Sequence, residues 1–250
     1  MHTPNWLELD DMTNVRDVGG LPTADGRTTR HGIIIRGETP DDLAAADVEH
    51  LVERLRLTRA IDLRMTKERP RTATSPLRDA GVDVVAFPLW ENPAVAEAVR
   101  KDVPDGEGYR VMASFYLKAI DGFRERAGEL LELLLTTSGA TLIHCTGGKD
   151  RTGMITALLL GAVGVPDETI IADYGATELR LERLYQRLSR LHAMEYPPKF
   201  IPTYANGADP QVMRFVIADL KIDHGTLRQW WRDAGVDEPM LEAWSGRFAA

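Results

Sequence analysis

The chain has 250 residues, of which 44% are hydrophobic and 27% are charged, a composition typical of a folded globular domain. Its formal net charge of -8 argues against nucleic acid as the main partner, since nucleic-acid binding favours a basic surface. The single cysteine excludes an intrachain disulfide, so folding does not depend on an oxidising compartment.

No targeting or membrane signal can be recognised in the sequence. The N-terminus lacks a basic stretch followed by an apolar core, and the apolar run after residue 153 is too short to span a membrane. Neither repeats nor low-complexity tracts interrupt the chain. We therefore expect a single domain over residues 1–250, located in the cytoplasm, although export by a route without such a signal stays open.

The first half of the chain alternates short strands with helical patterns. Asp25-Gly26 lies between two strand-like runs and is typical of a tight hairpin, and the β-branched run at 32–37 predicts a buried strand. Thr39-Pro40 is typical of a helix start, and the apolar period predicts a helix from there to about residue 56. Residues 60–64 and 82–88 predict two more strands.

Two features of this half bear on a site. Asp62 and Arg64 end one strand, and we interpret them as a structural pair in preference to substrate contacts. Residues 89–108 lose all periodicity and gather proline, glycine and acids, which predicts a long loop bordering a functional site.

The second half is mainly helical around one strand that precedes Cys145. A helix is expected from about Tyr109, and a strand, a polar loop and an apolar helix follow across residues 141–160. Asp167 is expected to cap the next helix, and leucines from 181 to 191 predict an amphipathic one. Further helices are expected at 213–220 and 226–234. Strands alternating with helices imply an α/β fold with a mainly parallel central sheet flanked by helices.

Residues 141–153 carry the chemistry. A buried strand ends in Cys145, a polar turn with two glycines follows, and Arg151 opens an apolar helix. Such a turn directs successive backbone N–H groups inward, and the helix N-terminus adds partial positive charge. The pattern predicts a site for a tetrahedral oxyanion. The residues expected around that oxyanion are His144, Thr146, Gly147, Gly148 and Lys149.

Cys145 is the candidate nucleophile, because the inward N–H groups and the helix N-terminus favour its thiolate. The same N–H groups can hold three phosphate oxygens, and Arg151 offers a planar fork for two of them. Thr152 can donate its hydroxyl to the thiolate when the phosphocysteine is hydrolysed. The implied reaction is two-step covalent phosphoryl transfer, which needs neither a metal nor a cofactor.

The same residues argue against three other kinds of site. A nucleotide phosphate loop would need glycine where the chain has Ile143, and serine or threonine where it has Asp150. A redox pair needs a second cysteine, and a zinc site needs more ligands than His144 and Cys145 provide. A buried structural cysteine would not call for two glycines and five polar residues at a strand end.

The motif His-Cys-x-x-Gly-Lys-Asp-Arg-Thr-Gly at 144–153 resembles the active-site signature of cysteine-dependent protein tyrosine phosphatases. Its Lys-Asp-Arg form is similar to a bacterial branch that includes a secreted mycobacterial phosphatase. Further blocks resemble the family in the same order, at residues 14–17, 60–64, 172–174 and 226–236. The resemblance covers most of the chain and implies a protein tyrosine phosphatase-like fold, with Cys145 as nucleophile and Arg151 as the phosphate-binding arginine.

The resemblance also implies a general acid. In this branch a loop aspartate, which matches Asp150, is proposed to protonate the leaving phenol, whereas other tyrosine phosphatases use a separate mobile loop. This chain departs from its relative after Pro88, where Leu89-Trp90 stand in place of an aspartate. Asp150 is therefore the preferred acid, and a role in bracing the loop is its alternative. The other candidate acids are Glu91, Asp102, Asp105 and Asp121.

Cationic residues bear on the choice of substrate. Members of the branch act on phosphotyrosine, phosphoserine, phosphothreonine and phosphoinositides, and Lys149 would either suit a head group with several phosphates or merely raise the local potential. A helix face of arginines is interpreted as a solvated face in preference to a lipid-binding one; its members are Arg180, Arg183, Arg187 and Arg190. The resemblance implies that residues 175–205 form a helical lid over the site.

These features together predict a phosphatase of phosphotyrosine proteins, with phosphoserine and phosphothreonine as further substrates. The alternatives are a phosphoinositide phosphatase with the same mechanism and, from another class, a non-catalytic phosphate-binding module. The partner is then a phosphorylated protein or a phosphoinositide, without stable membrane insertion. The oligomeric state is left open.

Overall fold

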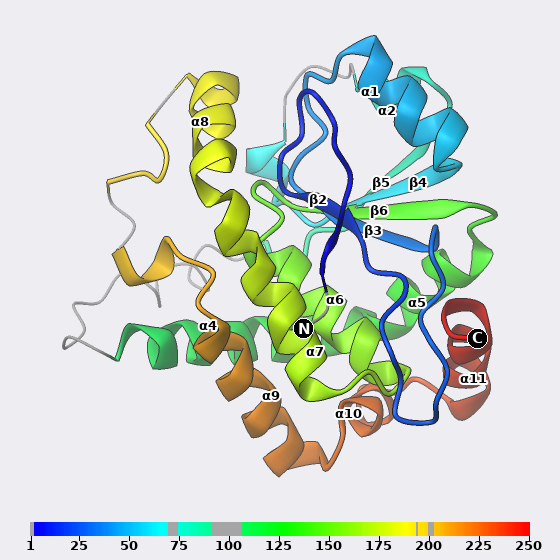
Figure 1. Cartoon of the computed structure of the whole chain (residues 1–250). Coiled ribbons are helices and arrows are strands. Elements are labelled where there is room, and N and C mark those ends of the chain that lie inside the picture. Colours follow the sequence, from blue (N-terminus) through cyan, green and yellow to red (C-terminus); the bar gives the residue numbers. More distant parts are fainter. Residues whose placement is uncertain (1–2, 70–74, 92–106, 194, 200–202) are drawn as a thin grey trace.

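The computed structural model describes residues 3–69, 75–91, 107–193, 195–199 and 203–250, and it is organised around one sheet (Figure 1). The strands lie in the order β1-β2-β3-β6-β4-β5. Strands β3, β6, β4 and β5 are parallel, and β1 and β2 extend the sheet in antiparallel pairing. The strands are β1 (Asn5–Trp6), β2 (Val15–Asp17), β3 (Ile34–Gly37), β4 (Leu57–Asp62), β5 (Asp83–Ala86) and β6 (Ala140–His144).

Helices cover both faces of this sheet (Figure 1). One face carries α1 (Ala45–Glu49), the π-helical turn η1 (His50–Arg54) and α2 (Pro76–Asp79). The other helices are α4 (Gly108–Phe123), α5 (Ala127–Thr136), α6 (Asp150–Ala162), α7 (Asp167–Gly175), α8 (Leu181–His192), α9 (Pro210–His224), α10 (Leu227–Asp233) and α11 (Glu238–Phe248). Short 3-10 turns are η2 (Thr66–Glu68), η3 (Arg124–Arg126), η4 (Ala176–Arg180) and η5 (Thr203–Ala205). The predicted α/β class with a mainly parallel, helix-flanked sheet is confirmed.

The sheet separates two hydrophobic cores, because successive residues of a strand point to opposite faces. In the central strand β6, Leu142 packs with α1, η1 and α2, whereas Ile143 packs into the larger core under α4, α5 and α6. The larger core also buries Trp230, Trp231 and Trp244. Strand β6 is therefore held rigidly on both sides, which fixes the point where Cys145 follows it.

Most predicted elements of the first half form, but one helix begins later than expected. The turn at Asp25-Gly26 is present, with Gly26 at φ +87°. The predicted helix start at Thr39-Pro40 is wrong, because α1 begins at Ala45 and Asp42 has φ 61°, a left-handed conformation that stops a helix. Residues 38–44 instead lie beside the loop after β6, where the Thr39 N–H donates to the carbonyl of Thr146.

Helix α8 confirms the predicted amphipathic helix, but its arginines do not form one solvated face. Arg183 and Arg190 are exposed, as expected, and Arg180 pairs with Glu8 at 2.6 Å. Arg187 is buried and donates to the carbonyl of Asp41 at 2.8 Å, so the prediction is wrong for this residue.

Two smaller differences concern helix ends. Helix α7 begins at Asp167 itself, with Pro166 in the capping position, so the expected Asp167 cap does not form. Helix α11 follows α10 and was not expected from the sequence. Among the described residues, no helix combines the length and the apolar character that crossing a membrane would need.

Candidate active site

The loop after β6, residues 145–151, lies at the carboxyl edge of the parallel strands. His144, the last residue of β6, is in register with Gly37 of β3 and with Asp62 of β4, so three strands end together. In α/β sheets this edge is where ligands bind. The structure therefore places the Cys145 loop (residues 145–151) at the expected position for a site, directly before helix α6.

Three consecutive carbonyl groups of the Cys145 loop are held from outside it. Because the peptide unit is planar and trans, a carbonyl that points outward directs the next N–H inward. The N–H groups that follow these carbonyls thus face the interior of the loop, as an oxyanion site requires. The contacts are Thr39 N–H to Thr146 (3.0 Å), the Asn14 side-chain amide to Gly147 (2.7 Å) and the Arg36 guanidinium to Gly148 (2.9 Å).

Gly148 cannot be replaced without moving the backbone. Its φ is +66°, a conformation that residues with a side chain rarely adopt. A Cβ at this position would also lie 2.4 Å from the carbonyl carbon of Gly37 and 2.5 Å from the nitrogen of Glu38. The close approach of the loop to the end of β3 therefore depends on glycine.

Cys145 and Thr152 are both buried at the centre of this arrangement. Cys145 is 3% exposed and Thr152 is fully buried in the first turn of α6. The hydroxyl of Thr152 has no hydrogen-bond partner within the described part of the chain. It is therefore free to donate to an acceptor at the loop, as the sequence analysis expects. The positive end of α6 and the inward N–H groups would stabilise an anion bound beside Cys145.

Arg151 is held by a carboxylate that the sequence analysis missed. Glu68, in the turn η2, accepts from both terminal nitrogens of Arg151 at 2.5 and 2.8 Å. Burial alone would lower the pKa of Arg151, but the Glu68 hydrogen bonds and the nearby charges raise it above its usual value. The Arg151 guanidinium also lies 5.3 Å from the ring centre of Trp90. Glu68 lies in the irregular segment after β4. The residues around it carry no sequence signal that Glu68 would bind Arg151.

Burial would also raise the pKa of Glu68, but the Arg151 contacts hold it below the usual value, so the two side chains form a partly buried ion pair. A guanidinium has five N–H donors, and this pair uses two of them. A third N–H of Arg151 donates to the Thr146 hydroxyl at 3.4 Å, so two donors remain for a bound oxyanion. The planar fork is thereby fixed in orientation before any ligand arrives.

Asp150 is the first residue of α6 and is tied to two buried tyrosines. The Tyr116 hydroxyl donates to Asp150 at 2.5 Å and lies 2.9 Å from the Tyr174 hydroxyl. Both tyrosines are essentially fully buried, whereas the Asp150 side chain is 34% exposed. Asp150 is therefore anchored at one oxygen and accessible, which is compatible with an acid and with a bracing role.

Lys149 does not extend into the loop interior. Its ammonium donates to the backbone carbonyl of Ala205 at 2.6 Å and to that of Asn206 at 3.3 Å, and it lies 3.6 Å from Asp150. In this arrangement Lys149 ties the Cys145 loop to the end of η5 and to the residue that follows it. Its positive charge stays close to the site without contacting its centre.

The remaining candidates divide between the site and the rest of the molecule. His144 is buried, with Nδ1 3.3 Å from the carbonyl of Cys145, so it supports the loop from behind and burial lowers its pKa. Glu91 accepts hydrogen bonds from Thr66, which lower its pKa and disfavour it as an acid. Asp121 is exposed near Arg124. Asp102 and Asp105 lie outside the described residues.

The predicted pair of Asp62 and Arg64 is confirmed as structural. Arg64 is 3% exposed and contacts both Asp62 and Asp41. Burial would lower the pKa of Arg64, but the hydrogen bonds that it donates to both carboxylates raise it. Because Asp41 and Asp62 neutralise this guanidinium, Arg64 is not available for an anionic ligand.

Helix α8 packs directly onto the Cys145 loop. A Cβ added to Gly147 would lie 3.6 Å from Leu184 and 3.9 Å from Leu188. Leu184 and Leu188 belong to a small hydrophobic cluster of their own on α8. The hydroxyl of Tyr185 donates to the carbonyl of Asn206. Part of the segment expected to form a lid, residues 175–205, thus lies beside the loop at Gly147, while residues 194 and 200–202 lie outside the described residues.

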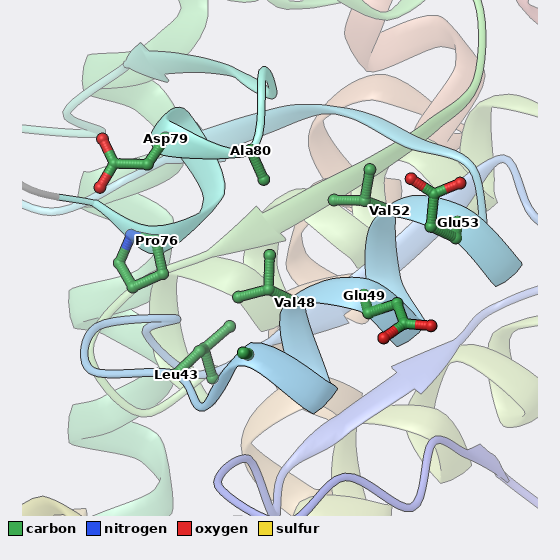
Figure 2. Close-up of a pocket in the computed structure, with 9 residues that line it drawn as sticks. Leu43, Val48, Glu49, Val52, Glu53, Pro76, Asp79 and Ala80 are labelled. Atoms are coloured by element: carbon green, nitrogen blue, oxygen red, sulfur yellow. The ribbon is translucent and has the colours of Figure 1, made fainter.

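A separate surface pocket of about 570 Å³ lies between α1 and α2 (Figure 2). Leu43, Val48 and Val52 line it, and the carboxylates of Glu49 and Glu53 stand at its edge. None of the predicted site residues contributes to it. Within the described ranges, no three histidine, cysteine or acidic side chains come together as metal ligands would.

Comparison with known proteins gives consistent matches. The chain matches the family model described as "Tyrosine phosphatase family" over residues 7–250. A protein of Cupriavidus necator, named as a tyrosine-protein phosphatase, is 33% identical over 197 residues, which are 77% of this chain and 70% of that protein. The triple specificity protein phosphatase PtpB of Mycobacterium tuberculosis is 27% identical over 276 residues, 96% of this chain and 97% of that protein.

Among solved structures, that of TpbA from P. aeruginosa matches with 18% identity and a TM-score of 0.33. The matched region covers 77% of this chain and 90% of the TpbA chain.

Proposed function

The chain belongs to the tyrosine phosphatase family, and we propose that it hydrolyses phosphotyrosine in proteins through a phosphocysteine intermediate on Cys145. The observation that carries this proposal is the outward anchoring of three consecutive carbonyls around a buried cysteine. That arrangement collects inward N–H groups where a phosphate would face the thiol, and Arg151 closes the same loop.

In the first step, the Cys145 thiolate attacks phosphorus, so a sulfur–phosphorus bond forms while the bond to the phenolic oxygen breaks. The loop N–H groups and the two remaining donors of Arg151 hold the phosphoryl oxygens as negative charge shifts among them. Asp150 transfers its proton to the departing phenolic oxygen. The products of this step are the free tyrosine side chain and phosphocysteine.

In the second step, water attacks phosphorus and the sulfur–phosphorus bond breaks. Asp150, now ionised, accepts a proton from the water, which returns it to its starting state. The departing thiolate of Cys145 accepts a hydrogen bond from the unpartnered hydroxyl of Thr152. Inorganic phosphate leaves and the cycle closes without metal or cofactor.

The arrangement of Lys149 supports phosphoproteins over phosphoinositides as substrates. A head group with several phosphates needs a further cation facing the site, but the Lys149 ammonium binds the carbonyls of Ala205 and Asn206. Arg64, another cation at this edge of the sheet, is neutralised by carboxylates. The second candidate function, a phosphoinositide phosphatase, is favoured only if Lys149 leaves its carbonyl partners on binding. The name of the Mycobacterium tuberculosis relative, a triple specificity phosphatase, supports including phosphoserine and phosphothreonine.

The substrate proposal is tested by turnover of matched phosphopeptides and soluble phosphoinositides on one preparation. We expect kcat/KM for phosphotyrosine peptides to exceed that for every phosphoinositide. The Lys149→Ala variant provides the control, and it should change the two rates by similar factors. A selective loss of phosphoinositide turnover in this variant would assign Lys149 to the substrate and overturn the preference.

The catalytic proposal is tested with Cys145→Ser. This variant should show no hydrolysis of p-nitrophenyl phosphate above background, while still binding a phosphotyrosine peptide by calorimetry. Retained hydrolysis would remove Cys145 from the mechanism. If the wild-type protein binds the peptide and never hydrolyses it, the non-catalytic phosphate-binding module is the correct assignment.

The organisation of the chain fits the same proposal. One sheet with a core on each face supports a single phosphatase domain over residues 1–250. The contact of Leu184 and Leu188 with Gly147 supports a lid within residues 175–205 that moves to admit substrate. We propose a phosphorylated protein as partner and the cytoplasm as location.

A further inference from the structure

Asp173 on α7 is a buried carboxylate that holds two buried arginines. One oxygen accepts from Nε of Arg16 at 2.8 Å and the other accepts from Arg36 at 2.5 Å. The backbone carbonyl of Asp173 accepts a further hydrogen bond from Arg16 at 2.5 Å. Both arginines are 1% exposed and Asp173 is 8% exposed, so water cannot replace these contacts.

Hydrogen bonds connect each arginine, directly or through Asn14, to the Cys145 loop. Arg36 donates directly to the carbonyl of Gly148 at 2.9 Å. Arg16 donates to the side-chain oxygen of Asn14 at 3.0 Å, and the amide nitrogen of Asn14 donates to the carbonyl of Gly147 at 2.7 Å. The Arg16 contact fixes which way the Asn14 amide points. Two of the three carbonyl anchors of the loop therefore originate at one carboxylate.

The charges in this network require that carboxylate. Two guanidinium groups buried side by side repel each other, and burial together with Arg36 lowers the pKa of Arg16 to about 10. Burial would raise the pKa of Asp173, but the two arginines lower it to about 2, so it is ionised at neutral pH. One negative and two positive charges leave one positive charge behind the loop. This surplus also favours a phosphate dianion in front of it.

We infer that Asp173 is a positioning residue of the phosphatase reaction, which rests on the function proposed above. By holding Arg16 and Arg36, Asp173 keeps the carbonyls of Gly147 and Gly148 turned outward. The N–H groups of Gly148 and Lys149 then point at the phosphoryl oxygens. Asp173 touches neither substrate nor nucleophile, and it acts on both through the loop backbone.

The variant Asp173→Asn tests this inference, because it keeps the shape of the side chain and removes its charge. In enzymes that stabilise an oxyanion with N–H donors, losing one donor lowers kcat by about 10²- to 10³-fold. We expect kcat for p-nitrophenyl phosphate to fall by about 10²-fold and the Kd for tungstate to rise at least tenfold, since both depend on the oriented N–H groups. The readouts are steady-state kinetics and calorimetry, normalised to folded protein below the unfolding transition.

A purely structural role predicts a different result. In that case Asp173→Asn would lower the melting temperature while leaving kcat and the tungstate Kd of the folded fraction within twofold of wild type. That result would overturn the inference. The matched control is Thr177→Val, which removes the 3.4 Å hydrogen bond that the same Arg16 guanidinium donates to Thr177. Thr177 is not one of the residues that connect Arg16 to the carbonyl of Gly147. Its kcat and Kd should stay within twofold of wild type.

A second variant decides the question if Asp173→Asn does not fold. Asn14→Ala removes the contact to Gly147 and leaves the pairing of Asp173 with both arginines in place. It should raise the tungstate Kd and lower kcat by about tenfold, in line with the loss of an orienting partner. An unchanged Kd and kcat in a folded Asn14→Ala protein would overturn the inference.

Failure of the proposed function gives a separate signature. If the wild-type protein hydrolyses no phosphate ester, the Kd for tungstate can still be measured for wild type and for Asp173→Asn and compared. A tenfold difference then supports positioning of an anion site without catalysis. Equal Kd values would overturn the positioning role itself.

Discussion

The contact between the Cys145 loop and the end of β3 gives the sharpest prediction for stability. Gly148→Ala introduces a Cβ that would lie 2.4 Å from the carbonyl carbon of Gly37 and 2.6 Å from its oxygen. These are backbone atoms within the sheet, so they cannot rotate away as a side chain would. Gly147→Ala, one residue earlier in the same loop, introduces a Cβ whose nearest atom is a Leu184 methyl at 3.6 Å.

The magnitude follows from two additive costs. A residue other than glycine at φ +66° costs about 1–2 kcal/mol. Overpacking a tightly filled position costs about 1–3 kcal/mol. Gly148→Ala should therefore lower the free energy of unfolding by about 2–5 kcal/mol. Gly147→Ala has ordinary contacts and no positive φ, so it should change that free energy by less than about 1 kcal/mol.

The assay is urea unfolding followed by tryptophan fluorescence, with the two variants and wild type in the same buffer. The slope m should be unchanged, so that the shift in midpoint reports stability. If Gly148→Ala and Gly147→Ala unfold within 1 kcal/mol of each other, the loop does not lie against β3 as described. The inward direction of its N–H groups would then lose its structural basis.

Three further predictions concern the acid and the buried charges. Asp150→Asn should slow hydrolysis of alkyl phosphates by about 10²-fold and that of p-nitrophenyl phosphate far less, since a good leaving group needs no proton; equal losses would place the acid elsewhere. Tyr116→Phe removes the 2.5 Å hydrogen bond to Asp150 and should lower the free energy of unfolding by about 1.5–3 kcal/mol, measured in urea; an unchanged stability would show that the bond is absent. The pKa of Asp173 is lowered from its ordinary 3.8 to about 2, so its contribution to stability is complete above about pH 4 and is lost as pH falls towards 2. In acid titrations Asp173→Asn should lack this part of the stability loss, and an identical pH profile would contradict the buried charge pairing.

The order of strands and helices could be predicted because it depends on local patterns. Apolar β-branched runs marked β3 and β6, and the leucine spacing of α8 marked its buried face. The Cys145 loop could also be recognised, since its glycines, thiol and guanidinium are close together in the sequence. Structure that depends on residues close together in the chain can be predicted from a single sequence.

The start of α1 could not be predicted, because long-range contacts override a good local pattern there. Thr39-Pro40 has the residues of a helix N-terminus, but Thr39 is bound to Thr146 and Asp41 is bound to Arg64. The segment therefore serves the loop, and the helix begins after it. Arg187 was misassigned for the same reason, since its partners in the segment 38–41 are remote in sequence.

The charges that surround the site were also hidden. Glu68 and Arg151 are separated by 83 residues, and Arg16 and Asp173 by 157 residues. Nothing in a single sequence pairs one particular carboxylate with one particular guanidinium over such distances. The resemblance to family blocks at residues 14–17 and 172–174 marked both members of the second pair, but only the fold shows that they meet.

The central claim, that Cys145 becomes phosphorylated in turnover, is tested most directly by trapping the intermediate. The protein is mixed with p-nitrophenyl phosphate, quenched in acid within the first turnover, digested and examined by mass spectrometry. We predict one added phosphoryl group on the peptide that contains Cys145, absent when the enzyme has exhausted its substrate before quenching. A phosphoryl group on any other residue, or full turnover with Cys145 unmodified at every quench time, would contradict the mechanism.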